Sequence, residues 1–558
     1  MKPNRYIVLS FLFFFLSLKL AAQTLPVGSN SGIEEYYRNQ QLKGMADTTV
    51  SMTVRPLFPF LTDSSSQRSI LSHLYTPSDA GFGPKVKFSL LSGSIQLQDN
   101  TNNPYGWNDG AMIPARGLQT LISAGIYFNY GILSIQLKPE IVMAQNETFS
   151  TFNPNQYDVI FARYYDIYNN IDLPVRFGTT SYYNVFAGQS SIRLNYRPFS
   201  IGLSTENLWW GPGVYNSLLM SNTAPGFPHL TLNTTKPAKT PIGSFEGQLI
   251  AGRLTNSGFP PLEPDHYYFG TDLYVPKPDN WRYLAGIIVT WHPKWVSGLF
   301  IGYDQASQTY GNQLSGIRDY LPIFSPIKKI SAPNGAINAQ QQLNSIFMRW
   351  IWPQEQFEFY FDWGHYDSGQ DMSQFLLSPQ QSRAYIVGLR KLLPFKKSAA
   401  GNILVGFEAT QMQGTSLTQD QAGQEWYVSQ AIRQGYTNEG QSLGAGIGPG
   451  GNLQTLEVSW VNGLKKIGLQ LNRYEHDNDF YYYTFSDSEN YTEHWIDITC
   501  GLITQWDYKN FVFNAKITAI RSLNYQWALK QNGDDIFFKN QLIDYNFQIQ
   551  AGLSYRFR

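Results

Sequence analysis

Apolar and polar positions alternate over long stretches of this chain, and the clearest run is the last one. One face of this run carries Tyr545, Phe547, Ile549, Ala551, Leu553, Tyr555 and Phe557, with polar or small residues at the positions between them. A period of two places these side chains on one face of a β-strand. Aromatic residues stand at both ends and aliphatic or small residues in the middle, which is typical of a strand that crosses a membrane.

The same period recurs in shorter runs along the chain. These are 132–137, 192–196, 356–363, 467–471 and 511–519. The intervening residues are mostly Asn, Gln, Ser, Thr and Arg, which suits a water-filled lumen better than a dry core. A closed barrel is the sheet that leaves no backbone group unpaired in a bilayer. At about 10 residues per strand, residues 80–558 have room for roughly 16–20 strands.

The sequence therefore predicts an all-β fold, a transmembrane antiparallel β-barrel over residues 80–558. The alternative is a soluble β-propeller or a tandem β-sandwich. Against it, the chain has neither a repeat of fixed period nor a linker at which the composition changes.

Residues 1–79, before the predicted barrel, show a different pattern. Residues 1–23 begin with the basic residues Lys2 and Arg5, continue with an apolar run and end with small residues. This pattern predicts a secretory signal peptide. The apolar run is short for an uncleaved anchor. Residues 24–79 are expected to form an N-terminal helical cap or plug, with one helix over 32–42 and a second over 65–75. Ser31 and Glu34 fit a capping box for the first helix.

The apolar face expected on the first helix is short, with Ile33, Tyr36 and Tyr37 on it and Leu42 off it. The whole segment is too short for the plug of an energy-coupled transporter. The sequence therefore predicts a barrel with a small helical element at its periplasmic mouth or in its lumen.

Composition narrows the choice of partners. The 558 residues include 41 basic and 41 acidic side chains, so no charge excess suggests a nucleic-acid partner. Seven histidines are scattered singly, and neither a metal site nor a cofactor is expected. A single cysteine, Cys500, excludes an intrachain disulfide and is expected to be a buried thiol.

Residues 202–230 contain the main candidate for chemistry. Trp209 and Trp210 stand side by side before a Gly211-Pro212-Gly213 break, and a second break follows at 224–228. Two indoles in a rigid loop offer a large amphipathic surface at low entropic cost. Sugars bind by stacking on such rings while polar side chains take their hydroxyls. The alternative is that both tryptophans pin a re-entrant loop against the barrel wall and never meet a ligand.

The residues predicted to bind polysaccharide are Glu206, Asn207, Trp209, Trp210, Tyr215, Ser221, Asn222, Arg253, Asp362 and Asp367. Asp362 and Asp367 could in principle serve as a catalytic carboxylate pair, but acids at a strand end more often bind sugar or hold a loop. Arg176, Arg193 and Arg253 are expected to face the lumen, and internal salt bridges are favoured for them.

Other short motifs give no convincing catalytic or metal site. Residues 440–444 match GxSxG and 446–451 match GxGxxG, but no helix is expected after either one. Residues 476–479 are oxygen-rich, yet they lack the glycine and distant glutamate of a calcium loop, so a solvated outer loop is expected. No catalytic residue is assigned.

The Thr205–Gly213 stretch, with Ser221-Asn222 and the 224–228 turn, resembles Wzi-type capsule-assembly proteins. Further similar segments are 37–42, 55–57, 108–110, 116–117, 173–178, 188–193, 435–441 and 446–450. The resemblance covers nearly the whole mature chain and is nearest to a branch found in Bacteroidota-like bacteria. It implies an outer-membrane barrel of about 18 strands with an N-terminal helical bundle, acting as a lectin that holds capsular polysaccharide at the cell surface.

Three functions follow for testing. The favoured one is a non-enzymatic, monomeric barrel of the outer membrane that anchors capsular or extracellular polysaccharide, with lipid as its other partner. The second is a porin or passive channel, which needs an open lumen. The third is an outer-membrane hydrolase, whose activity would depend on one Ser, His or Asp.

Overall fold

The computed structural model describes residues 24–28, 31–58, 80–81, 86–154, 156–314, 320, 340–367, 382–395, 401–414, 425–485, 494–528 and 542–557. The expected signal peptide and the expected helix over 65–75 lie outside these residues. None of the helices within them has both the length and the apolar character needed to span a bilayer.

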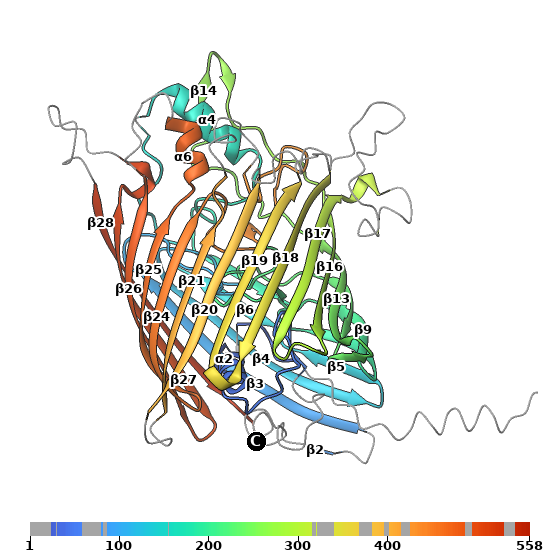
Figure 1. Cartoon of the computed structure of the whole chain (residues 1–558). Helices are drawn as coiled ribbons and strands as arrows, with labels where there is room; N and C mark the ends of the chain where they lie inside the picture. Colours follow the sequence, from blue (N-terminus) through green and yellow to red (C-terminus); the bar gives the residue numbers. More distant parts are fainter. Residues whose placement is uncertain are drawn as a thin grey trace, which may run out of the picture.

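The chain forms a closed antiparallel barrel of 18 strands (Figure 1). The last strand, β28 (Ile543–Tyr555), closes the barrel by pairing with the first full strand, β3 (Val86–Asn100). Three strand positions are each divided: between β5 (Leu133–Leu137) and β6 (Glu140–Ala144), between β7 (Tyr182–Phe186) and β8 (Ser191–Tyr196), and between β11 (His229–Thr234) and β12 (Ala238–Thr240). The predicted fold class is confirmed.

The remaining wall strands are β2 (Ala80–Gly81), β4 (Gly117–Tyr130), β9 (Phe199–Ser204), β13 (Gly243–Leu254), β16 (Arg282–Pro293), β17 (Leu299–Tyr310), β18 (Gln340–Trp352), β19 (Phe357–Asp367), β20 (Arg383–Pro394), β21 (Asn402–Gln411), β24 (Asn452–Asn462), β25 (Lys465–Glu475), β26 (Ile496–Tyr508) and β27 (Phe511–Leu523). Short elements outside the wall are β1 (Val54–Arg55), β10 (Trp209–Trp210), β14 (Tyr267–Tyr268), β15 (Thr271–Asp272), β22 (Thr437–Asn438) and β23 (Gln441–Ser442), with single 3-10 turns at Gly311–Gln313, Pro353–Glu355 and Tyr525–Trp527.

The outward face of the wall is apolar, as the alternation predicts. Exposed aliphatic side chains on it are Ile122, Val185, Ile192, Leu194, Ile201, Leu203, Leu230, Leu232, Ile346, Leu456, Val458, Leu469, Ile498, Leu502, Ile517 and Ile549. Exposed rings near the strand ends are Tyr130, Tyr183, Tyr196, Phe199, Tyr508, Phe511 and Tyr545. This is the band and girdle of a barrel that spans a lipid bilayer.

Cys500 lies on this outward face of β26, between Ile498 and Leu502 in the alternation, and it is exposed. The prediction of a buried thiol was therefore wrong. The position has the parity of lipid-facing residues, where a small apolar side chain is suitable without burial inside the protein.

The two ends of the barrel differ. Short turns such as 131–132, 197–198 and 509–510 close one end, which we call the short-turn end. Helices α4 (Asp158–Tyr168) and α6 (Asn478–Phe485) and the β14–β15 hairpin cover the other, the long-loop end (Figure 1). In bacterial barrels the short turns face the periplasm and the long loops face outward. The C-terminus lies at the short-turn end (Figure 1).

Helix α2 (Ser31–Leu42) is present where the sequence predicts it and lies inside the lumen, toward the short-turn end (Figure 1). Ile33 and Tyr37 pack with Leu25 and Val50 in a small apolar cluster. Leu42, off that face, is fully buried against wall side chains, namely Phe300, Ile351, Leu392, Leu404 and Val461. A helix enclosed by a barrel is in contact on more than one side, so both sets of residues are used.

The lumen is not water-filled throughout. The 205–228 segment and part of the 425–451 segment enter it and form a hydrophobic core with the wall, called here the lumen core. Its large members are Trp210, Leu218, Leu219, Met220, Phe227, Leu284, Ile288, Phe347, Tyr360, Ile386, Trp426, Tyr427 and Tyr436. The expectation of a wet lumen is wrong for this part, because inserted chain brings apolar side chains to meet apolar wall residues.

Candidate functional site

The tryptophan pair lies in the lumen, where the N-terminal segment holds it. Strand β10 pairs antiparallel with β1, so that Val54 is opposite Trp210 and Arg55 is opposite Trp209. Neighbouring residues of a strand point to opposite sides. The two indoles therefore face different surroundings.

Trp210 belongs to the lumen core and is fully buried, with 0% of its surface exposed. Its Nε1 donates a hydrogen bond to Gln248 Oε1 at 2.9 Å. Its ring lies against Gly286 of β16, where an added Cβ would approach the ring to 2.7 Å. These contacts match the alternative in which the ring pins the loop to the wall.

Trp209 lies on the other side of β10, at the edge of a cavity. The Arg55 guanidinium stacks over its ring at 4.6 Å from the centroid. Its Nε1 is buried and has no hydrogen-bond partner. Of the two rings, Trp209 is the one placed to meet a ligand.

The turn after the tryptophans is fixed to the wall by a carboxylate. The backbone N–H groups of Val214 and Asn216 donate to Glu408 of β21 at 2.7 and 2.9 Å, and Tyr215 N–H donates to it at 3.2 Å. Consecutive amides of this kind form an anion-binding nest. Because the chain's own Glu408 occupies it, the nest is not open to a ligand. At Gly213 an added Cβ would lie 1.9 Å from Asn216 O, so the turn requires glycine there.

The Glu206 carboxylate also forms an ion pair and hydrogen bonds within the protein. Arg193 Nη2 donates to its Oε2 at 2.6 Å, and Ser204 Oγ donates to the same oxygen at 2.9 Å, while the Thr24 hydroxyl donates to Oε1. Burial by itself would raise the pKa of Glu206, but the Arg193 charge and these hydrogen bonds lower it below its ordinary value. The internal salt bridge favoured for Arg193 is present.

Asn207 and Ser221 are likewise buried, and their side chains form hydrogen bonds within the protein. Asn207 Nδ2 donates to Ala224 O at 2.8 Å, and Ser221 Oγ donates to Gly444 O at 2.5 Å. Asn222 Nδ2 donates to Asn108 O at 2.9 Å, and its side chain also reaches the cavity.

The three predicted residues outside the loop are dispersed. Arg253 is exposed on the outward face of β13, with its guanidinium 5.4 Å from the Trp281 ring centroid, so its expected lumen-facing position is wrong. Asp362 of β19 is buried beneath Gly211, where an added Cβ would lie 2.9 Å from its carboxylate. Asp367 ends β19, and its side chain lies outside the described residues. Arg176 is buried and donates to Asn146 O at 2.5 Å.

The catalytic motifs fold as loops. Ser442 of the GxSxG match is buried in β23, opposite Thr437 of β22, and no described helix follows it. The GxGxxG match runs directly into β24. Residues 476–479 are not a solvated loop: His476 stacks on Trp495 at 3.6 Å, and the buried Asp479 accepts the Gly414 N–H at 2.9 Å. Nowhere in the described part of the chain do three metal-ligating side chains gather.

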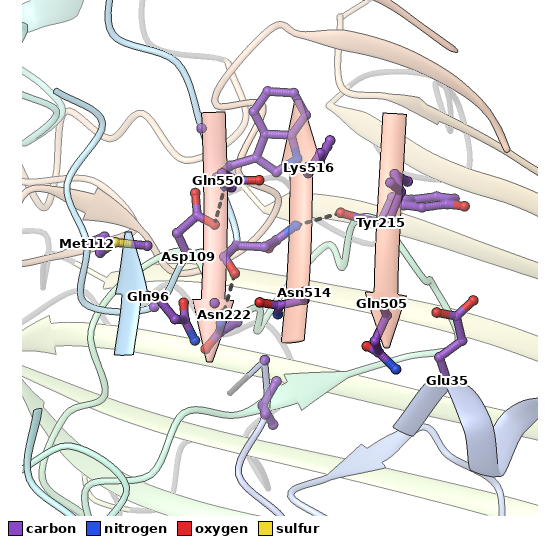
Figure 2. Close-up of a pocket in the computed structure, with 18 of the residues that line it drawn as sticks. Glu35, Gln96, Asp109, Met112, Tyr215, Asn222, Gln505, Asn514, Lys516 and Gln550 are labelled. Atoms are coloured by element: carbon purple, nitrogen blue, oxygen red, sulfur yellow. Dashed lines mark hydrogen bonds between the residues drawn. The ribbon is translucent and has the colours of Figure 1, made fainter. Parts of the chain in front are cut away.

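A cavity of about 400 Å³ lies between the tryptophan loop, the 101–116 loop, α2 and the wall from β25 to β28 and β3 (Figure 2). We call it the amide cavity. Its rings are Tyr105, Trp107, Trp209 and Tyr215, and its amide side chains are Gln96, Asn108, Gln189, Asn222, Gln470, Asn472, Gln505, Asn514, Gln548 and Gln550. Of the ten predicted binding residues, the structure brings Trp209, Tyr215 and Asn222 to it.

Several polar atoms at the cavity wall lack a partner although they are buried. They include Trp209 Nε1, Gln470 Oε1 and Glu140 Oε2. Leaving a buried polar atom unpaired costs about 1–3 kcal/mol. A ligand rich in hydroxyl groups would recover part of this free energy.

The cavity extends from Lys466, near the short turns, to Leu453 and Thr455, near the long-loop end of β24. Along the lumen face of β27, Ser522 and Thr518 are buried, whereas Asn514 is exposed. The long-loop half of the same face is packed. Water therefore has access to the amide side chains of the cavity that lie near the short turns.

Most of the cavity lining was not predicted from the sequence, above all Trp107, Asp109, Lys516 and Gln550. One signal was present, because Asn546, Gln548 and Gln550 form the polar face of the final run. The other was the segment 108–110, which carried part of the family resemblance. What the sequence did not show is that the 101–116 loop folds back over the lumen.

A family model described as "Capsule assembly protein Wzi" matches residues 174–514. A similar solved structure is Wzi of Escherichia coli, described as an outer-membrane protein involved in group 1 capsule assembly and a carbohydrate-binding β-barrel. It is 13% identical, with a TM-score of 0.58 over 95% of this chain and 99% of that chain, which shows the fold alone.

Two further solved barrels are more distant. OccAB2 of Acinetobacter baumannii is 8% identical, with a TM-score of 0.40 over 84% of this chain and 98% of that chain. OccK7 of Pseudomonas aeruginosa is 9% identical, with a TM-score of 0.36 over 85% of this chain and 99% of that chain. No curated protein matches the chain.

Proposed function

Because this chain belongs to the Wzi capsule assembly protein family, we propose that it binds capsular or other extracellular polysaccharide and anchors it at the cell surface. The chain is a β-barrel of the outer membrane. One observation carries the proposal: the amide cavity combines aromatic rings with amides and with buried polar atoms that lack partners.

The lining suits a saccharide for a physical reason. Rings such as Trp209 and Tyr215 offer flat apolar faces for the C–H side of a sugar, and amide groups both donate to and accept from hydroxyls. A few oriented polar groups among aromatic side chains are the usual make-up of a small-molecule site. The solved Escherichia coli relative is described as binding carbohydrate, which agrees with this proposal.

We propose binding, and neither catalysis nor passive transport, as the activity. The lumen core packs inserted chain against β13 to β20 inside the described lumen, which disfavours a porin. The GxSxG serine lies buried in a hairpin without the following helix that a nucleophile needs. The aliphatic outer face is suited to lipid on all sides, which favours a monomer.

The decisive experiment compares cells that lack the protein with cells that carry single variants. Deletion is expected to release cell-bound polysaccharide into the medium. Trp209→Ala is expected to release a large part of it at an unchanged level of folded barrel. Trp295→Ala is the matched control, because that ring is 66% exposed near the short turns and away from the cavity.

Retention that is unchanged by deletion would refute polysaccharide anchoring. Retention lost on deletion but unchanged in Trp209→Ala would refute the amide cavity as the site. In a planar bilayer, the purified protein is expected to show no steady conductance, and an open-channel current would support the porin instead.

A further inference from the structure

Two of the three cations that face the amide cavity form ion pairs. Lys466 Nζ lies 2.8 Å from Glu35 and 2.7 Å from Glu457. Arg55 lies 3.7 Å from Glu34. Lys516 of β27 differs, because it forms no ion pair with any described residue. The cavity therefore presents one unmatched cation.

The strand register places amides around this lysine. Gln550 of β28 is directly opposite Lys516 (Figure 2). One step toward the short-turn end, Asn514 lies between Gln505 of β26 and Gly552 of β28. Gln550 Nε2 donates to Gln98 Oε1 at 2.7 Å, which leaves its own carbonyl oxygen facing the cavity without a donor bond from the protein. Lys516 is thus a charged side chain in a row of amide side chains on β26 to β28.

Gly552 lies within that row, and the Asn514 side chain covers it. Gln96 of β3 is directly opposite Gly552 on its other side, so a missing side chain separates Asn514 from Gln96. An added Cβ at Gly552 would lie 1.9 Å from Asn514 Oδ1. The Asn514 carboxamide therefore occupies the space above Gly552, next to Lys516 along the row.

We propose that the amide cavity holds an acidic saccharide unit, with the anionic group of the sugar paired to Lys516 and its hydroxyls bound by the surrounding amides. A charge-assisted hydrogen bond is stronger than a neutral one and is favoured where water is scarce. A neutral sugar would leave Lys516 without a counter-charge. Asp109 forms no ion pair with Lys516, and its charge offsets that of the lysine only from a greater distance, once the carboxyl is ionised.

This inference rests on the proposed function and names the sugar class for that site. The test titrates purified full-length protein in detergent with a digalacturonate, with its carboxyl-reduced neutral counterpart and with inorganic phosphate, by calorimetry. The digalacturonate is expected to bind at least about tenfold more tightly than the other two, the effect of one charge-assisted hydrogen bond.

Lys516→Gln is expected to abolish this preference by lowering the affinity for the digalacturonate to that for the neutral disaccharide. Gly552→Val is expected to weaken both disaccharides, because the added side chain displaces the Asn514 amide while the charge of Lys516 is kept. Lys509→Gln is the matched control, since this lysine lies in the turn before β27 with its amine 5.3 Å from the Tyr508 ring centroid. Each variant is first checked for the wild-type melting temperature.

Equal affinity for the acidic and neutral disaccharides, or a preference that survives in Lys516→Gln, would overturn the inference. Phosphate binding as tight as that of the digalacturonate would also overturn it, because the site would then recognise an anion and not a sugar. If whole polysaccharide still depends on the protein for retention in any of these cases, the proposed function stands and only the acidic subsite fails.

Discussion

Trp209 and Trp210 are adjacent in sequence and chemically identical, yet their surroundings are opposite. Trp210 is enclosed by the lumen core, and its N–H is satisfied by Gln248. Trp209 borders the amide cavity, and its buried N–H has no partner. The difference follows from strand alternation in β10. One ring stabilises the inserted loop, and the other borders the cavity that we propose as the binding site.

The lumen as a whole shows the same contrast, with packed apolar positions on one side and open polar positions on the other. On β16, β18 and β20 the lumen-facing positions include Leu284, Phe347 and Ile386, which pack on the inserted loop. On β26 to β28 they include Gln505, Lys516 and Gln550, which leave space. The apolar wall residues fix the loop, and the polar wall residues keep a hydrated cavity beside it.

The largest effect is expected from removing the packed ring. Trp210→Ala should destabilise the inserted loop by about 4 kcal/mol, because a large buried side chain leaves a cavity in a packed core. Trp209→Ala should cost clearly less, since that ring already borders empty space. Limited proteolysis of the N-terminal segment, with thermal melting in detergent, measures both. Equal losses in the two variants would contradict the division of the lumen.

The next largest effect is expected from the buried ion pairs that hold α2 against the wall. Glu358 of β19 is fully buried and binds Arg38 of α2 at 2.7 Å, Arg349 at 2.7 Å and Arg390 at 3.5 Å. Glu358→Gln leaves three guanidinium groups without their shared counter-charge. Removing one partner of a buried ion pair typically costs about 3 kcal/mol or more.

The expected result for Glu358→Gln is easier proteolysis of residues 24–58 and a lower melting temperature. Glu355→Gln is the control, because its 3.7 Å pair with Lys391 is exposed and worth less than about 1 kcal/mol. If the two substitutions behave alike, the charge cluster is not what anchors the helix.

The sequence predicted the outer half of this structure well. Outward positions such as Ile467, Leu469 and Leu471 must match lipid, so their period of two survives any change inside the barrel. Inward positions gave a weaker signal, because the same alternation is compatible with water, with inserted chain or with a packed core. The Leu284 and Ile288 positions of β16 meet inserted chain, and only the folded structure shows this.

The candidate site was predicted in part for a related reason. The Trp209-Trp210 loop was identified correctly as important, but sequence spacing cannot say which of two neighbouring rings faces a cavity. Partners such as Glu408 and Lys516 lie about 200 to 300 residues away along the chain. Arg253 was misplaced because one residue of strand parity decides between lumen and lipid.

The smallest effect expected is a pH dependence from Asp109 in the 101–116 loop. Partial removal from water raises the pKa of its carboxyl from 3.8 to about 7, against the lowering effects of the Lys516 charge and the Gln550 amide. Because the folded state holds the proton more tightly than the unfolded chain, the stabilising contribution is complete below pH 3.8 and is lost as pH rises through about 7.

Melting temperatures measured from pH 5 to 9 should therefore fall more steeply for the wild type than for Asp109→Asn, which cannot ionise. The charged groups that also face the cavity are Glu34, Glu35, Glu140, Arg55 and Lys466, and the variant retains all of them. An ionised Asp109 also offsets the charge of Lys516, so affinity for an acidic sugar should decline over the same pH range. Parallel pH profiles for the two proteins would show that Asp109 is already ionised at neutral pH, and the amide cavity would then be more hydrated than its lining indicates.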